Sequence, residues 1–387
     1  MISRRRKNNL LEWFLEPFIS KRGDGHQPDF VMLTVIGLLL FFGLIFLSSA
    51  SSNLAFYKYQ DTYRFVKQQI IHGILPGLLF FYLTIRINYA YYRKLAVLLL
   101  FASFGLLILV FLTSLSGNYS AQSWIILAGF SFQPSELVKL FLIIFLATWF
   151  EKKSSEMKDL KSTTIPFVVI MGLISILIIK QPDIGNLTII GATALAMYYV
   201  AGAKLTHLWS ILGAGALAFI VMVKTAPYRM NRITVWLNPD VDPQGIGWQI
   251  KQSLIAVGSG GWLGLGLGAS RQKSYLPQPA NDSIFAVIAE EIGFIFTLAF
   301  IILFSILIYR GFQIVRQSND NFAKLLALGI TIWIALQVLI NIGGMLKIMP
   351  LTGVPLPFIS LGGTNLVVTL IAMGILANIS KFTNSHK

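Results

Sequence analysis

The sequence has no cysteine and little charge: 12% of its 387 residues are Asp, Glu, Lys or Arg. The absence of cysteine excludes disulfide bonds, thiol catalysis and thiolate metal sites. The four histidines are scattered, without the HExxH spacing of a zinc site. Soluble domains carry about 25% charged residues, so the shortage of charge excludes a monomer that is soluble in water.

The sequence is rich in apolar residues. They make up 55% of the chain, and the mean hydropathy is +0.71. A helix that crosses a bilayer needs about 20 apolar residues, and about ten segments qualify or come close. These segments are 30–49, 66–85, 95–113, 136–150, 164–179, 184–201, 206–223, 284–309, 325–346 and 360–379. The predicted fold class is therefore an all-α polytopic membrane protein with about ten transmembrane helices.

The charges that are present are mostly basic, with 31 Lys and Arg against 16 Asp and Glu. Most of the basic residues lie in the two tails and in every second short loop, and the alternate short loops hold few. This asymmetry is the positive-inside bias rather than a nucleic-acid footprint. We therefore expect a multi-pass protein of the cytoplasmic membrane, with both termini cytoplasmic and no nucleic-acid partner.

The predicted organisation follows from the spans and from this orientation. It consists of a basic, amphipathic cytoplasmic tail (1–29), transmembrane helices 1–7 (30–224), a large extracytoplasmic loop (225–283), transmembrane helices 8–10 (284–380) and a cytoplasmic tail (381–387). The first tail is either an interfacial helix held by anionic lipid or a solvated tail. The loop is long, polar and punctuated by Gly and Pro, so chemistry or binding is expected there.

Charged residues at membrane depth are the first candidates for a site. Glu136 and Lys139 lie three residues apart behind Pro134, which suits the first turn of a helix, so they can pair on one helix face. Ionisable groups inside a membrane are functional candidates, although a purely structural ion pair is the alternative. Lys180 and Asp183 meet at a tight turn, where Asp183 either caps the next helix or lines a cavity.

The large loop holds further candidates. Gly264-x-Gly266-x-x-Ala269 fits a loose dinucleotide fingerprint, but no strand precedes it, so close backbone packing or a bulky ligand explains these glycines better. The basic residues of the loop suit a diphosphate or lipid headgroups; they include Arg229, Arg232, Arg271 and Lys273.

Three acids mark the end of the loop and the helix that follows it. Asp282 lies directly before the apolar run that begins at Ile284, where it reads either as a helix N-cap or as a functional acid. Glu290 and Glu291 lie about two turns into that helix. Acids at such depth need partners, and Lys139 and Lys180 are available to supply them.

Motifs between about Phe132 and Ser380 resemble those of the SEDS (shape, elongation, division and sporulation) family, the FtsW/RodA peptidoglycan glycosyltransferases. The matching pieces are Gln133-Pro134-Ser135-Glu136-x-x-Lys139, Gln181-Pro182-Asp183-x-Gly185, Asn238–Gly247, Gln252–Gly261, Ser270–Lys273, Tyr275–Pro277, Asp282–Gly293 and Leu351–Gly363. Ser270–Lys273 and the Asp-x-Ile-Phe-Ala run are closer to the division-type FtsW branch than to the elongation-type RodA branch. The sequence departs from the family at Ala280 and Asn281, where the family usually has His-Thr.

The resemblance implies a function and a site. It implies a ten-helix fold and polymerisation of lipid II, the undecaprenyl-diphosphate disaccharide-pentapeptide, at the outer face of the membrane. It also implies a class B penicillin-binding protein transpeptidase and other divisome or elongasome membrane proteins as partners. No cofactor is certain, and a divalent cation (Mg²⁺ or Mn²⁺) is the one candidate. We take Asp282 as the catalytic base. The substrate-binding candidates are Glu136, Lys139, Lys180, Asp183, Arg229, Arg232, Gln252, Ser259, Arg271, Lys273, Glu290 and Ser360.

Two other classes of function stay open. One is a flippase or exporter of the same polyprenyl-linked precursor, and the other is a non-catalytic scaffold for a transpeptidase. A transporter needs a path open to both faces of the membrane, whereas a polymerase needs polar groups near the outer face only. Since the candidate charges map to the outer side, the sequence favours the polymerase.

Overall fold

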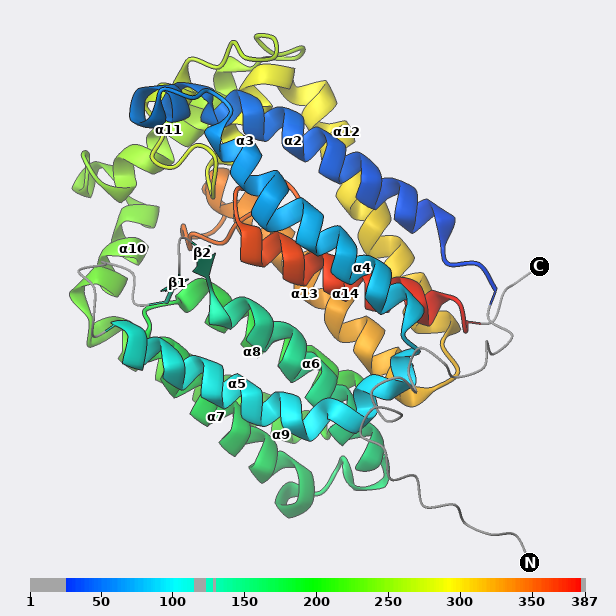
Figure 1. Ribbon diagram of the computed structural model, residues 1–387. Coiled ribbons are helices and arrows are strands. Elements are labelled where there is room, and N and C mark those ends of the chain that lie inside the picture. The colour runs from blue at the N-terminus through cyan, green and yellow to red at the C-terminus, as the bar shows by residue number, and fades with distance from the viewer. Residues whose placement is uncertain (1–25, 115–122, 128–129, 384–387) are drawn as a thin grey trace, which may run out of the picture.

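The computed structural model describes residues 26–114, 123–127 and 130–383, and this part of the chain is almost entirely helical (Figure 1). The elements are α2 (Phe30–Tyr59), α3 (Arg64–Gln69), α4 (Leu75–Arg86), α5 (Tyr92–Ser114), β1 (Ile125–Leu127), β2 (Phe130–Phe132), α6 (Pro134–Lys152), α7 (Ile165–Lys180), α8 (Ile184–Val200), α9 (Leu205–Lys224), α10 (Pro227–Leu237), α11 (Ile246–Ser259), α12 (Ile284–Gln317), α13 (Asn321–Met345) and α14 (Gly363–Ser380). The predicted amphipathic segment of the first tail lies outside the described residues.

The all-α membrane fold is confirmed. Among the described residues, eight helical segments are long and apolar enough to cross a membrane. The two remaining expected spans are α6, which carries Glu136 and Lys139 among its 19 residues, and α8, which has 17 residues. Several helices run past the predicted limits. α2 extends to Tyr59 instead of ending near residue 49, because the polar residues after Leu47 continue the helix rather than end it.

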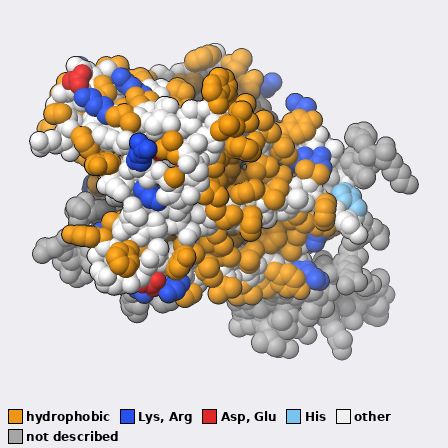
Figure 2. All heavy atoms as spheres, turned by 90° about the horizontal axis from the view of Figure 1, so that it is seen from above, with side chains coloured by type: hydrophobic (Ala, Val, Ile, Leu, Met, Phe, Trp, Pro, Cys, Tyr) orange, Lys and Arg blue, Asp and Glu red, His pale blue; other side chains and the backbone are white. Residues whose placement is uncertain are grey.

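α13 and α14 form the centre of the bundle. Their apolar windows are 72% and 83% buried, whereas that of α9 is 6% buried. α13 packs against α6, α8, α12 and α14, and α14 packs against α4. The outer helices present large apolar side chains such as Leu98 and Phe101 on their surfaces, and Figure 2 shows hydrophobic side chains over a broad area of one face. Such a surface suits contact with lipid.

The two ends of the bundle differ. At one end, here called the loop end, the segment 225–283 folds into α10 and α11, and the short antiparallel hairpin of β1 and β2 lies there as well (Figure 1). At the opposite end, the backbone N–H of His26 donates to the carbonyl of Lys381 at 3.0 Å, so the two ends of the described chain lie side by side. Arg93 forms ion pairs there with Glu151 and Asp320, which joins α5, α6 and the start of α13.

Helix α12 is interrupted at Gly293, whose φ is 71° and ψ is −178°. The glycine-rich segment after α11 pairs with this break, because Leu265 N–H donates to the Glu290 carbonyl and Phe294 N–H donates to the Gly261 carbonyl. A Cβ on Gly293 would lie 2.2 Å from the nitrogen of Gly264. These glycines therefore allow two backbones to touch, as the sequence indicated, and no strand introduces them as a dinucleotide site would require.

Candidate functional site

A polar cavity of about 380 Å³ opens at the loop end. Its lining comes from the residues that flank the hairpin, the start of α8, α10, α11, the segment before α12, the loop between α13 and α14 and the first turn of α14. The lining residues are Ser123, Trp124, Gln133, Pro182, Asp183, Asn186, Arg232, Gln249, Pro277, Gln278, Asn281, Asp282, Gly353, Val354, Pro355, Leu361, Gly362 and Asn365. We call this cavity the chamber. It brings together three of the predicted site residues, Asp183, Arg232 and Asp282, from distant parts of the chain.

Asp282 lies in the chamber wall directly before α12. The N-cap of α12 is Ser283, without a capping side-chain hydrogen bond, so the interpretation of Asp282 as the cap is wrong. One carboxylate oxygen, Oδ2, accepts from Gln249 Nε2 at 3.3 Å. The other, Oδ1, is buried and has no hydrogen-bond partner among the described residues. Burial raises the pKa of this carboxyl group. The hydrogen bond from Gln249 opposes that shift most, followed by the backbone N–H groups of Asp282 and Ser283 and by the positive charge of Arg232.

The backbone around Asp282 is held by two polar side chains. Asn341 of α13 donates from Nδ2 to the carbonyls of Asp282, at 2.9 Å, and Val354, at 2.8 Å. Ser360 donates from Oγ to the Asn281 carbonyl at 2.6 Å and accepts from Leu356 N–H. The segment before α12 and the loop before α14 are thereby fixed to each other. Ser360, predicted to bind substrate, is placed where it joins these two segments.

Asp183 forms the opposite part of the lining. Its carboxylate caps α8 by accepting from Asn186 N–H, as the sequence indicated. It also accepts from Gln133 Nε2, from Ser135 Oγ and from Asn186 Nδ2, all at 2.9–3.0 Å. Asp183 thus ties the start of α6 to the start of α8.

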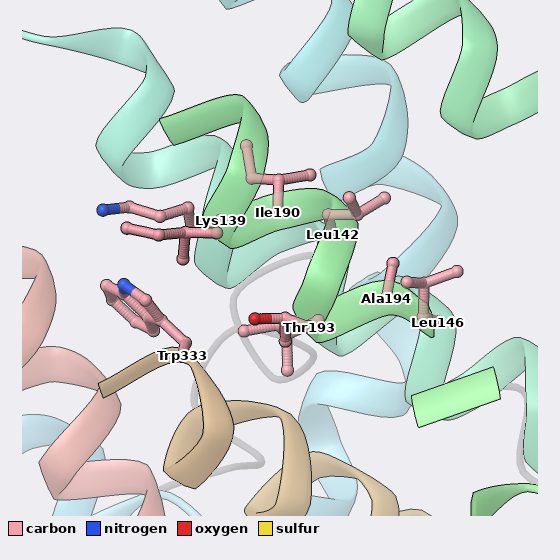
Figure 3. Close-up of a pocket in the computed structure, with 9 residues that line it drawn as sticks. Lys139, Leu142, Leu146, Ile190, Thr193, Ala194 and Trp333 are labelled. Atoms are coloured by element: carbon pink, nitrogen blue, oxygen red, sulfur yellow. The ribbon is translucent and has the colours of Figure 1, made fainter. Parts of the chain in front are cut away.

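Glu136 and Lys139 lie beneath the chamber, in the first turns of α6. They form a buried ion pair of 2.9 Å, which confirms the predicted i,i+3 pairing. Asn365, which lines the chamber, donates to Glu136 Oε2 at 2.6 Å. Lys139 also donates to Gln337 Oε1 and lies 5.1 Å from the centre of the Trp333 ring. Figure 3 shows Lys139 and Trp333 side by side at a small cavity that includes Thr193. Lys139 itself does not line the chamber.

Of the basic residues Arg229, Arg232 and Lys180 at the loop end, only Arg232 lines the chamber. Arg232 lines the chamber, donates to the Leu351 carbonyl at 3.0 Å and to the Tyr228 hydroxyl, and its Nε has no partner among the described residues. Arg229 donates to the carbonyls at Met222 and Ile179. Among the described residues neither arginine forms an ion pair. Lys180 is exposed at the end of α7 and does not line the chamber.

A second polar cluster surrounds Glu290. Its carboxylate accepts from Ser270 Oγ at 2.5 Å, from Ser259 Oγ and from backbone N–H groups of 271–272. Lys273 is buried and donates to the Gly268 and Ser49 carbonyls. The partners of Glu290 are therefore loop hydroxyl and N–H groups, and the expectation that Lys139 or Lys180 supplies them is wrong. The Arg271 side chain is exposed, and Gln252 is buried on α11. Neither lines the chamber.

Sequence reasoning missed several polar residues at the chamber. Gln249, Asn186 and Asn365 line it, and Asn341 donates to the backbone of two residues that line it. The available signal was a polar amide inside an otherwise apolar helix, since such groups need partners at membrane depth just as charges do.

Two apolar grooves adjoin the chamber. One, of about 610 Å³, lies among α4, α6 and α14 and shares Trp124, Asn281, Leu361 and Gly362 with the chamber. The other, of about 450 Å³, lies among α8, α9, α10 and α13 and shares Arg232 with it. We call them the α4/α14 groove and the Arg232 groove. The chamber is therefore a polar compartment between two apolar ones.

The comparison with known proteins decides the family. The model of the FtsW/RodA/SpoVE family, described as a cell cycle protein, matches residues 29–385. The chain belongs to this family. Its relatives include stage V sporulation protein E of Bacillus subtilis (strain 168), 40% identical over 359 residues that cover 92% of this chain and 98% of the relative. A probable peptidoglycan glycosyltransferase FtsW of Trichlorobacter lovleyi is also 40% identical, over 92% of this chain and 93% of the relative.

Solved structures agree with the family fold. A chain from a peptidoglycan synthase complex that coordinates polymerization and crosslinking matches with a TM-score of 0.76 and 25% identity, over 91% of this chain and 97% of that chain. Thermus thermophilus RodA matches with a TM-score of 0.67 and 24% identity, over 92% and 98%. The chain is thus a multi-pass membrane protein of this family, and its relatives named FtsW and SpoVE agree with the division-type resemblance.

Proposed function

We propose that this protein is a peptidoglycan glycosyltransferase that polymerises lipid II into glycan strands. The observation that carries the proposal is the chamber. It combines a carboxyl group with an unpaired oxygen, a cation without a carboxylate partner and direct continuity with apolar grooves. A substrate made of sugars, diphosphate and a polyprenyl chain needs this combination. The homologues named peptidoglycan glycosyltransferase support it.

The reaction assigned to the chamber is an inverting glycosyl transfer. The acceptor 4-hydroxyl oxygen forms a bond to the anomeric carbon of the donor, and the bond from that carbon to the diphosphate oxygen breaks. The electron pair leaves with the diphosphate, and the hydroxyl proton passes to the Asp282 carboxylate. Because a diphosphate leaves without being protonated, one base and one centre of positive charge suffice.

The chamber residues have distinct roles in this scheme. Asp282 is the base, and its raised pKa brings it nearer to the pH at which a general base is effective. Arg232 neutralises charge on the leaving diphosphate. Gln249 orients the Asp282 side chain, whereas Asn341 and Ser360 fix its backbone. Glu136 and Lys139 support the chamber floor through Asn365.

A divalent cation is a further part of the proposal. The described residues contain no group of three or more His, Asp or Glu that could hold an ion. Mg²⁺, however, usually binds through one or two carboxylates together with substrate phosphates. The Asp183 carboxylate and the unpaired Oδ1 of the neighbouring Asn186 would hold such an ion, so that Asp282 Oδ1 stays available to the acceptor hydroxyl. When bound, it would neutralise charge on the donor diphosphate.

The proposed orientation places the loop end at the outer face of the cytoplasmic membrane and both termini in the cytoplasm. The basic bias of the alternate loops supports this orientation. A class B penicillin-binding protein is the proposed transpeptidase partner, since the similar solved chain belongs to a complex that couples polymerization and crosslinking. Other divisome or elongasome proteins and the membrane complete the proposed set of partners.

The flippase alternative is less well supported. A carrier needs a path through the bundle, but the space beneath the chamber is filled by the Glu136–Lys139 pair and Trp333. At the far end, Arg93 ties α5, α6 and α13 together. The test is to supply purified protein with purified lipid II and to measure glycan chains. Glycan formation supports the proposal, and its absence both alone and with the transpeptidase partner would contradict it.

A further inference from the structure

The Arg232 groove is an apolar compartment with a positively charged end. Its wall is mostly apolar and includes Phe219, Ile233, Trp236 and Ile340, and Arg229 and Arg232 supply its positive charge. Arg232 is the residue that this groove shares with the chamber. A long apolar chain with an anionic head is the ligand chemistry that such a groove complements.

The α4/α14 groove differs from it in charge. No Lys or Arg lines that groove; its polar groups are neutral amides and hydroxyls and the His72 side chain. The two grooves have no lining residue in common, and each meets the chamber through residues of its own. The chamber can therefore be reached by two separate apolar chains, one on each side.

The two substrates of a lipid-linked polymerisation differ in where their diphosphates lie. The donor reacts at its anomeric carbon, to which the diphosphate is directly bonded. The acceptor reacts at the 4-hydroxyl of its outer sugar, so its own diphosphate lies at the other end of the disaccharide. Only the donor diphosphate must therefore lie beside Asp282 during the reaction. Arg232 is the chamber cation whose charge acts on Asp282.

We propose that the Arg232 groove binds the polyprenyl chain of the donor and that the α4/α14 groove binds the polyprenyl chain of the acceptor. This assignment rests on the proposed polymerase function and adds to it the side from which each substrate enters. The donor diphosphate lies against Arg232, where it gains the electron pair of the broken bond. The acceptor chain reaches the chamber past Trp124 and Leu361, and presents its 4-hydroxyl to Asp282.

The test uses two substrate analogues that each have one role. Lipid II with a methylated 4-hydroxyl can serve only as donor. Lipid II with a methylene group in place of the anomeric oxygen cannot lose its diphosphate, and serves only as acceptor. Together they give a single coupled product, so the KM of each substrate can be measured separately. A protein that couples these analogues reports on the groove assignment alone, whereas one that neither couples them nor polymerises lipid II contradicts the proposed function itself.

Three variants place a tryptophan on the surface of the bundle. Thr188→Trp fills the Arg232 groove from an exposed position on α8. Ile71→Trp fills the α4/α14 groove from a position that is 58% exposed. Val169→Trp, on the exposed surface of α7 and in neither groove, controls for the added ring. Thermal unfolding checks that each variant folds, and Thr188→Phe replaces Thr188→Trp should the larger ring prevent folding.

The assignment predicts opposite effects of the two groove variants. Thr188→Trp should raise the KM for the donor-only analogue about tenfold, because the added ring displaces about two methylene groups of the polyprenyl chain from the groove. The KM for the acceptor-only analogue should stay unchanged. Ile71→Trp should do the reverse, and Val169→Trp should change neither. The inference is overturned if Thr188→Trp raises the acceptor KM, raises both KM values equally, or changes neither.

Discussion

Gln249 Nε2 donates to Asp282 Oδ2 at 3.3 Å, and the second oxygen of that carboxylate has no hydrogen-bond partner among the described residues. One oxygen is thus held by the protein, and the other is left for a hydroxyl donor. The same Gln249 nitrogen donates to Ser283 Oγ at 3.0 Å, which fixes the amide to the segment that carries Asp282. A single glutamine of α11 therefore sets the orientation of the proposed base.

Replacing Gln249 tests this role through the pH dependence of activity. Gln249 lowers the pKa of Asp282, which burial raises, so Gln249→Leu should raise that pKa further. The base acts only when deprotonated. The acid limb of the rate profile should therefore move to higher pH, with a smaller loss at alkaline pH. Initial rates across a pH series measure the shift. Lys251→Ala, on the same helix and paired with Asp240, should leave the profile in place; an unmoved profile for Gln249→Leu would remove Gln249 from this role.

Part of this site could be predicted from the sequence. Four features depend on residues that lie close together in the chain: the spans, the helix start at Pro134, the Glu136–Lys139 pair and the capping by Asp183. For such features, the periodicity and spacing of the residues are enough to predict the local structure. The Gln252–Gly261 motif points to Gln252 and gives no sign of Gln249, because sequence does not reveal how α11 is rotated about its axis. That rotation turns Gln249 toward Asp282.

Other features depend on contacts between distant segments. Asn341 reaches the carbonyl of Asp282, 59 positions away, and nothing local to either residue indicates this contact. The sequence predicts a lysine partner for Glu290, but the segment 270–272 turns back on α12 and supplies N–H and hydroxyl donors instead. The sequence indicates that a buried carboxylate needs hydrogen-bond or charged partners. Only the fold shows which groups supply them.

The buried ion pair beneath the chamber predicts a pattern of stability. Lys139→Met leaves Glu136 buried without its cation and should cost about 3–5 kcal/mol of unfolding free energy. Glu136→Gln combined with Lys139→Met removes both charges and should recover much of that loss. Thermal unfolding in detergent compares the single and double variants. Equal destabilisation by the two would mean that the pair does not behave as a coupled unit.

The break in α12 predicts a sharp requirement for glycine. Gly293→Ala must place a Cβ where the backbone of Leu263 and Gly264 already lies, in a conformation that is almost restricted to glycine. We expect a markedly lower Tm or failure to accumulate in the membrane. Gly172→Ala, in α7 with nothing within 4 Å of its Cβ position, is the matched control and should be tolerated. Normal accumulation and Tm for Gly293→Ala would show that the break is not constrained.

The proposed orientation can be tested with reporter fusions. A reporter fused after Lys158 should lie in the cytoplasm, and one after Gln244, between α10 and α11, should lie outside. Alkaline phosphatase and a fluorescent protein give opposite signals at each position. Both reporters on the same side would contradict the ten-span topology.

The central claim is that Asp282 is the catalytic base, and Asp282→Asn tests it most directly. The amide oxygen can still accept from Gln249, and the Asp282 backbone keeps its bond to Asn341, so folding should be retained. The amide cannot take a proton from a hydroxyl at neutral pH. Loss of a general base typically lowers a rate by about 10²–10⁴-fold. The measurement is glycan-chain formation from lipid II, with thermal unfolding as the check on folding. The account predicts a folded protein with that loss of rate; polymerisation by Asp282→Asn at nearly the unmodified rate would contradict it.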